Sequence, residues 1–193
     1  MKENLLGGRS WEKDDSFAAA VQAEPLNFLD VYNEHFAFVW RSARAIGVAT
    51  SSLDDVVQEV FIVVHKKLAS FEGRSRVRTW LTGILINAVR DHRRTLRRKG
   101  EHEELHDNVV DPQIGPGQHA ENAEVAARIL SALDTLNEEQ RQVFVLAELE
   151  EMSAPEISEA LGVNLSTIYS RLRLARVAFE RHVQRMKARG EVS

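Results

Sequence analysis

Hydrophobic residues recur along this chain at the three- and four-residue spacing of amphipathic helices, and no convincing run alternates as a strand does. Gly47 and Gly162 each follow one of these periodic segments, in the position where glycine commonly ends a helix. The pattern therefore predicts an all-α fold. The predicted helices cover about 25–46, 52–68 and 77–98, a segment from 137, a short one at 153–161 and a long one from 165.

Polar residues mark where several of these helices begin. Ser52, followed by Asp54 and Asp55, is the expected N-cap of the second helix and puts two acids in its first turn. Ser153 and Glu156 are spaced as a capping box, and a similar pattern starts at residue 137. The third helix is expected to bury one apolar stripe, made of Trp80, Leu81, Ile84, Leu85 and Ala88.

One segment between the two sets of helices lacks apolar periodicity. It covers residues 99–121, and Pro112, Gly115, Pro116 and Gly117 mark it as a linker. We therefore expect two small helical domains joined by an acidic, flexible linker. The boundaries would be a loose tail at 1–24, an N-terminal helical bundle at 25–98, the linker at 99–121 and a C-terminal domain at 122–189.

Composition limits the protein's class and location. The 193 residues suffice for one ordinary domain or two small ones. The chain has no cysteine, which excludes a disulfide framework, a cysteine-containing zinc site and a thiol nucleophile. No signal-peptide core is visible, and no apolar run approaches the roughly 20 residues needed to cross a bilayer. We expect a cytoplasmic protein without membrane insertion.

The net charge of −4 hides a strongly uneven distribution. Residues 74–100 contain nine lysines and arginines against one acid, and residues 165–189 contain seven against one. Residues 101–156 contain fourteen acids against two arginines. Two basic blocks separated by an acidic one indicate two contacts with a polyanion, although solvated helix faces are an alternative.

The second basic block lies in a predicted helix-turn-helix. A short helix ends at Gly162, and the next helix begins with polar residues and becomes basic, as DNA-reading helices do. Hydroxyl and guanidinium groups can read base edges, and Arg171 and Arg176 can hold phosphates. An ordinary helical hairpin is the alternative. The expected outward residues are Ser166, Thr167, Tyr169, Ser170 and Arg173.

The first basic block lies on the third predicted helix, opposite its apolar stripe. An amide set among arginines suits contact with an unpaired base beside phosphates. Trp80, flanked by arginines, is either a core residue or a stacking platform. The residues expected on this face are Asn87, Arg90, Asp91, Arg94 and Arg97, and the flanking arginines are Arg74, Arg76 and Arg78.

Two further motifs have competing interpretations. Asp54, Asp55, Gln58 and Glu59 form an acidic and amide patch that can meet a basic partner helix, although the helix macrodipole also favours acids there. Residues 102–106, His-Glu-Glu-Leu-His, match a zinc-protease pattern, but their polar flanks and the adjacent prolines argue against a catalytic metal helix. We expect no metal, no cofactor and no catalytic residue.

Two blocks of these residues resemble bacterial sigma factors of the sigma-70 family, in particular the small extracytoplasmic-function (ECF) type. The resemblance covers about residues 26–98 and 122–186. The first block is Phe71, Gly73, Val77-Arg78-Thr79-Trp80-Leu81, Ile84, Asn87, Asp91, Arg94 and Arg97. The second is Leu136, Gln140-Arg141, Val143-Phe144, Leu146, Glu148-Leu149-Glu150, Met152-Ser153, Glu156-Ile157, Ala160-Leu161-Gly162-Val163, Ser166-Thr167-Ile168, Ser170-Arg171-Leu172 and Ala175-Arg176.

The resemblance implies a division of labour between the domains. The N-terminal domain would bind core RNA polymerase through the acidic patch and open the −10 promoter element, with a flipped base near Asn87. The helix-turn-helix would bind the −35 element, the linker would thread toward the polymerase active-site channel, and an anti-sigma factor would hold the protein inactive. Ile86, Ser166 and Tyr169 depart from residues common in the family, which bears on the bases that are read.

Three other functions stay open from the sequence. The chain could be a helix-turn-helix regulator that binds duplex DNA alone as a dimer. It could be a zinc hydrolase using His102 and His106, or an adaptor that binds only protein through its acidic faces.

Overall fold

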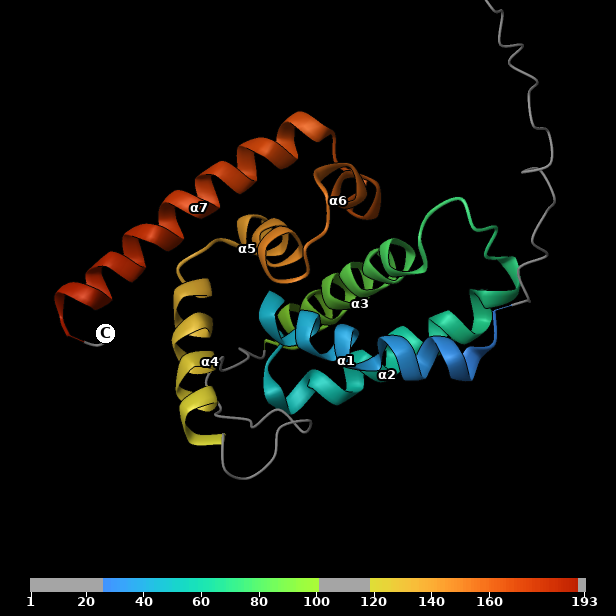
Figure 1. Cartoon of the computed structure of the whole chain (residues 1–193). Coiled ribbons are helices and arrows are strands. Elements are labelled where there is room, and N and C mark those ends of the chain that lie inside the picture. Colours follow the sequence, from blue (N-terminus) through green and yellow to red (C-terminus); the bar gives the residue numbers. More distant parts are fainter. Residues whose placement is uncertain (1–25, 101–118, 191–193) are drawn as a thin grey trace, which may run out of the picture.

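The computed structural model describes residues 26–100 and 119–190, with side chains from residue 125 in the second range, and these residues form helices joined by short turns (Figure 1). Between Leu26 and Gly190, leaving out 101–118, there is no strand, as the sequence predicts. No helix in these ranges is long and apolar enough to cross a membrane.

The N-terminal half consists of three long helices and one short turn. Asn27 caps the first helix, since its Oδ1 accepts a hydrogen bond from the Leu29 amide at 2.9 Å. Gly47 ends that helix with φ +100°, a conformation that favours glycine. The elements are α1 (Phe28–Ile46), α2 (Thr50–Lys67), the 3₁₀ turn η2 (Leu68–Ser70) and α3 (Val77–Lys99).

The predicted start of α2 is wrong. The helix begins at Thr50 after the N-cap Ala49, so Ser52 lies inside it and Asp54 and Asp55 fall beyond the first turn. Val48 and Ala49 are buried beside the end of α1, which brings the chain back onto the core within three residues of Gly47. The start of α2 is therefore set by packing, without a side-chain cap.

The C-terminal half begins three residues earlier than the sequence suggests. Both predicted caps are confirmed: Asn137 accepts from the Gln140 amide at 2.9 Å, and Ser153 and Glu156 form a complete capping box. These bonds to Ser153 lower the pKa of the Glu156 carboxyl. The elements are α4 (His119–Leu133), α5 (Glu138–Phe144), the π-helical turn η3 (Val145–Leu149), α6 (Ala154–Leu161) and α7 (Leu165–Ala188).

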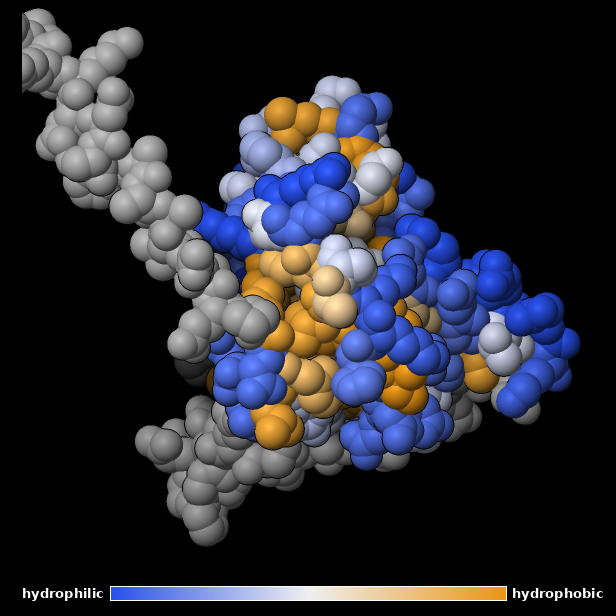
Figure 2. Space-filling model, turned by 90° about the vertical axis from the view of Figure 1, so that its right-hand side faces the viewer, coloured by the Kyte–Doolittle hydropathy of each residue, from blue (hydrophilic) through white to orange (hydrophobic). Residues whose placement is uncertain are grey.

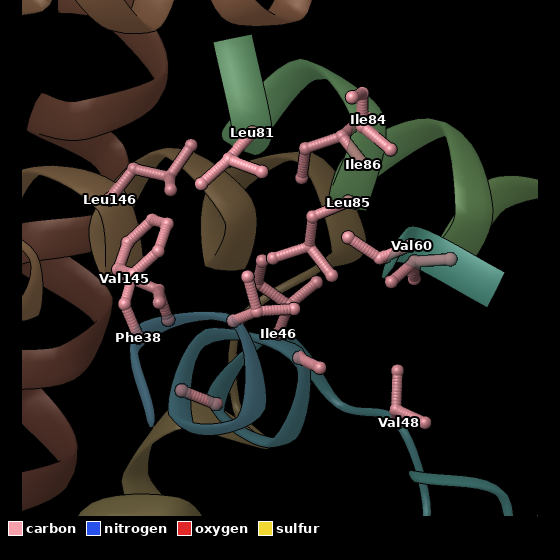
Figure 3. Packing of buried hydrophobic residues seen from close by; sticks show 14 of the residues in the cluster. Phe38, Ile46, Val48, Val60, Leu81, Ile84, Leu85, Ile86, Val145 and Leu146 are labelled. Carbon is pink, nitrogen blue, oxygen red and sulfur yellow. The ribbon is translucent and has the colours of Figure 1, made fainter. Parts of the chain in front are cut away.

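The two halves share one hydrophobic core. Figure 1 shows α3 in the middle of the molecule, with α1 and α2 on one side and α6 on the other. Leu81 of α3 and Phe38 of α1 meet Val145 and Leu146 of the second half (Figure 3). At Gly83 the contact reaches the backbone, because a Cβ there would lie 3.3 Å from the carbonyl oxygen of Ala160.

This packing changes the predicted buried face of α3. Leu81, Ile84 and Leu85 are buried as expected, whereas Trp80 and Ala88 are half-buried. A single stripe fails to describe α3 because helices cover it on two sides. The additional buried residues are Thr79, Thr82, Ile86 and Val89.

Candidate nucleic-acid interface

The outward face of α3 carries the predicted amide and charged residues together. All five residues of this face are exposed, namely Asn87, Arg90, Asp91, Arg94 and Arg97. Arg90 Nη1 donates to the Asn87 side-chain oxygen at 3.2 Å, and Arg94 pairs with Asp91 at 3.0 Å. Because the Asn87 side-chain oxygen faces Arg90, the donors of the Asn87 amide nitrogen point away from Arg90. The Arg90 guanidinium beside this amide suits a phosphate.

A groove of about 440 Å³ runs between α2 and α3 beside Asn87. Its polar lining includes Asp55 and Glu59 from α2 and Asp91 from α3. Val56, Val63, Ile84 and Ala88 supply apolar surface to the same groove. An apolar floor with carboxylate and amide groups at the edge fits the flat face and the amino group of a base.

The acidic patch of α2 therefore divides between two grooves. Asp54, Asp55 and Gln58 edge a second groove of about 680 Å³ between α1 and α2. Since the macrodipole acts within the first helical turn, the position of these residues is not explained by the helix N-terminus alone.

Aromatic side chains line that second groove. Tyr32 and Phe61 lie 4.7 Å apart between ring centroids, and Phe28 meets His65 edge-on at 5.1 Å. Viewed from the side where α1 begins, hydrophobic residues gather between hydrophilic ones on the molecular surface (Figure 2). An apolar groove with an acidic edge is suited to an amphipathic basic helix.

The arginines beside Trp80 are already engaged within the chain. Trp80 packs against Phe71, with 4.9 Å between the ring centroids and the rings tilted by 42°, and it is half-buried, so it belongs partly to the core and partly to the surface. Arg76 pairs with Glu156 at 3.4 Å, and Arg78 Nη2 donates to Glu150 at 2.5 Å. Two predicted nucleic-acid residues of the N-terminal half thus contact carboxylates of the C-terminal half.

The helix-turn-helix presents only part of its predicted reading face. The hydroxyls of Ser166 and Thr167 both donate hydrogen bonds to Oδ1 of the N-cap residue Asn164 at 2.8 Å, so both hydroxyls take part in capping α7. Ser170, Arg173 and Tyr169 are exposed, and Tyr169 keeps 55% of its surface. These three are the predicted reading residues that lie exposed to solvent beyond the first turn of α7.

The two predicted phosphate-binding arginines of α7 lie on its flanks. Arg171 pairs with Glu139 at 2.7 Å, and Arg176 donates its Nε to Glu148 at 2.8 Å. A phosphate would have to displace these carboxylates or join them, because each guanidinium already has an anionic partner.

Sequence reasoning gave no role to Arg141, which is 6% exposed. Its Nε donates to the Ala45 carbonyl and its Nη1 to Asp134, both at 2.6 Å. Burial lowers the pKa of Arg141, while Asp134 opposes that shift. Arg93 donates to the neighbouring carbonyl of Ile46 at 2.8 Å, so two arginines cap the end of α1.

The zinc-protease motif at 102–106 lies outside the described residues. Within 26–100 and 125–190, no group of three or more histidines and acids is arranged to hold a metal ion.

Comparison with known families identifies both halves. Residues 31–99 match the family described as sigma-70 region 2, and residues 126–179 match sigma-70 region 4. The chain belongs to the sigma-70 family. Region 2 corresponds to the N-terminal half, and region 4 corresponds to the C-terminal half with the helix-turn-helix. The similarity to relatives such as the ECF sigma factor SigM identifies the chain as a sigma factor of the ECF type.

Curated relatives match over most of their length. The sigma factor NccH of Alcaligenes xylosoxydans xylosoxydans is 29% identical over 81% of this chain and 87% of NccH. The ECF sigma factor SigM of Mycobacterium tuberculosis is 28% identical over 91% of this chain and 87% of SigM.

Two solved structures have the same fold. CnrH, in complex with the cytosolic domain of CnrY, is 25% identical with a TM-score of 0.61, over 81% of this sigma factor and 87% of CnrH. RpoE of Bartonella quintana, in complex with the anti-sigma factor NepR, is 20% identical with a TM-score of 0.66, over 81% of this chain and 96% of RpoE, which compares the fold alone.

Proposed function

We propose that this sigma factor binds core RNA polymerase and directs it to promoters through two separate DNA contacts. The observation that carries the proposal is that each half matches one sigma-70 region and each presents an exposed basic helix face. In this proposal residues 25–98 act on the −10 element, residues 122–189 act on the −35 element, and 99–121 link them.

The face of α3 would hold the opened −10 element. A base inside a duplex cannot reach the groove beside Asn87, so it must leave the stack, at a cost of a few kcal/mol. The apolar floor and the edge groups of the groove would offset that cost. Arg90 and Arg94 would contact the neighbouring phosphates, and Trp80 would stack at the upstream edge.

The exposed start of α7 would read the −35 element in the major groove. Ser170 and Arg173 face outward at the point where recognition helices contact bases. Each good bidentate contact contributes about 1–3 kcal/mol of base discrimination. Arg171 and Arg176 on the flanks of α7 would add phosphate contacts. For this, their ion pairs with Glu139 and Glu148 would rearrange or break.

Core polymerase would bind the acidic edge of α2. Asp54, Asp55 and Gln58 lie on the rim of the aromatic groove, so charge and apolar surface occur on one face. A basic amphipathic helix of the polymerase would use both. Glu59 would contribute from the adjoining groove.

The regulatory and cellular setting follows from the same proposal. CnrH, a relative over 87% of its length, was solved with the cytosolic domain of CnrY bound. We propose that a comparable anti-sigma factor holds this chain inactive in the cytoplasm, where its polymerase is. The chain would act by binding, with catalysis left to the polymerase.

The match to sigma region 2 argues against a stand-alone dimeric regulator, because such a protein needs no polymerase-binding half.

Run-off transcription with purified core polymerase and a promoter library tests the proposal. Reactions without the chain, and with the chain but no core, are the controls. We expect one promoter class to be enriched only in the complete reaction, and uniform initiation across the library would refute the function.

A further inference from the structure

The first turn of α7 gathers three hydrogen-bond donors on one side-chain oxygen. Asn164 caps this helix, and its Oδ1 accepts a hydrogen bond from the Thr167 amide at 2.9 Å. The same oxygen accepts from the hydroxyls of Ser166 and Thr167, both at 2.8 Å. One amide therefore fixes both hydroxyls at the start of the helix that we assign to the −35 element.

The direction of these hydrogen bonds follows from the backbone. A backbone N–H only donates, so the Asn164 atom that faces it is the carbonyl oxygen and not the amino nitrogen. A carbonyl oxygen carries no hydrogen, so both hydroxyls must donate to it. A serine hydroxyl has one hydrogen and two lone pairs, so the Ser166 hydroxyl can only accept from a partner outside the chain.

Ser166 lies on the face of α7 that the proposed function turns toward DNA. Ser166, Ser170 and Arg173 follow one another at spacings of four and three residues, so they share one side of the helix, and all three are exposed. Thr167 is half-buried. Figure 1 shows this end of α7 at the edge of the molecule, next to α6. Of the two fixed hydroxyls, the one of Ser166 is therefore the one that can meet a base.

A hydroxyl that can only accept discriminates between bases. In the major groove adenine and cytosine present an amino group, whereas guanine presents only acceptors and thymine presents an acceptor and a methyl group. Phosphate oxygens are also acceptors, so this hydroxyl does not suit the DNA backbone. A hydroxyl that rotates freely can donate or accept, and it would not distinguish the two classes of base.

We propose that Asn164 is a positioning residue for base recognition, which makes Ser166 select an amino-bearing base, adenine or cytosine, in the −35 element. This inference rests on the proposed function and deepens it, because it names the class of base that one residue of α7 selects. Asn164 holds the hydroxyl hydrogen before DNA arrives, so the selection requires no contact between Asn164 and the base.

Selection by the holoenzyme from a promoter library with a randomised −35 element tests the class of base. We expect the wild-type chain on core polymerase to favour adenine or cytosine over guanine or thymine at one position of one strand. The factor should be about three- to tenfold, which corresponds to one hydrogen bond between neutral groups. S166A should lose this preference and keep those at the other positions. An unchanged profile, or an equal loss of binding to all sequences, would overturn the inference.

The variant N164G separates positioning from capping. Glycine is tolerated at an N-cap, but it removes the oxygen that holds the Ser166 hydrogen. We expect N164G to bind the four bases about equally at the position that Ser166 reads. N164D, whose carboxylate still accepts from the hydroxyl, should keep the preference for adenine and cytosine.

A second asparagine cap provides the matched control for N164G. Asn137 caps α5 by accepting from the Gln140 amide, so N137G removes the same kind of cap from another helix. We expect N137G to leave the base profile unchanged. A profile that N164G also leaves unchanged would make Asn164 a helix cap only and overturn its positioning role.

A base analogue tests the contact without any change at Asn164. In the selected −35 site, unsubstituted purine replaces adenine, or pyrimidin-2-one replaces cytosine, and each replacement removes the amino group. The weaker base pair affects both proteins alike, so the loss of affinity should be about three- to tenfold larger for the wild type than for S166A. Equal losses would overturn the contact, and this result does not depend on whether N164G folds.

Two outcomes distinguish the inference from the function on which it rests. A holoenzyme that selects no −35 sequence at all would reject the proposed function and this inference together. A selected −35 element in which no position responds to S166A or N164G would reject the inference alone.

Discussion

Replacing Arg141 with methionine should cost the folded protein about 2–4 kcal/mol. The change removes two hydrogen bonds of 2.6 Å, one to the Ala45 carbonyl and one to the Asp134 carboxylate. Bonds that involve a charged group contribute about 1.5–3 kcal/mol each. Methionine recovers part of this loss, because it is not penalised by the burial that lowers the pKa of Arg141. Asp134 keeps 23% of its surface, so water replaces part of the missing partner.

Urea unfolding followed by circular dichroism measures this loss. R173M is the matched control, because Arg173 is exposed and its replacement should change the free energy of unfolding by less than about 0.5 kcal/mol. The variant D134N completes a double-mutant cycle, in which we expect a coupling of at least about 1 kcal/mol with Arg141. A loss below about 1 kcal/mol for R141M, or additive effects in the cycle, would show that the buried guanidinium contributes little.

Four further predictions concern the proposed interfaces and pH. D55R/E59R should weaken binding of core polymerase about tenfold or more with the fold intact, measured by co-elution; equal retention would contradict it. R173A should alter base preference at the −35 element by about 1–3 kcal/mol in competition binding, and an unchanged preference profile argues against base contact. N87A should reduce permanganate reactivity of the −10 region on a matched template and should reduce transcription from both matched and pre-melted templates; opening and transcription of both like the wild type would make Asn87 a surface residue only. Burial lowers the pKa of His35 below 6.5, so the unfolded chain takes up the proton first as the pH falls. The free energy of unfolding should therefore drop from about pH 7 toward pH 5 in the wild type, and less so in H35Q. Parallel pH curves for the two proteins would contradict this.

The sequence predicts those features that depend on neighbours along the chain. Gly47 ends α1, and the Ser153–Glu156 box begins α6, because both devices are complete within four residues. The exposure of Ser170 and Arg173 follows from helical periodicity alone in the same way.

The remaining features depend on contacts between distant residues. The start of α2 was predicted wrongly because buried Val48 and Ala49, and no capping side chain, determine it. The acid partners of Arg171 and Arg176 were missed because they come from α5 and η3. The role of Arg141 depends on a carbonyl 96 positions earlier, which no local pattern records.

The order of synthesis gives the contact between the halves a further consequence. Glu138, Glu150 and Glu156 of the C-terminal half are all encoded after residue 137, whereas the arginines of the N-terminal half with which they pair are complete by residue 97. At about 5–20 residues per second, a ribosome needs several seconds to add the intervening chain. During that interval a nascent chain on the ribosome carries Arg76, Arg78, Arg93 and Arg97 without their glutamate partners, so these guanidinium groups can pair with RNA or DNA near the ribosome. Ribosome-bound chains stalled at about residue 135 and at full length should therefore differ in their retention on immobilised single-stranded DNA.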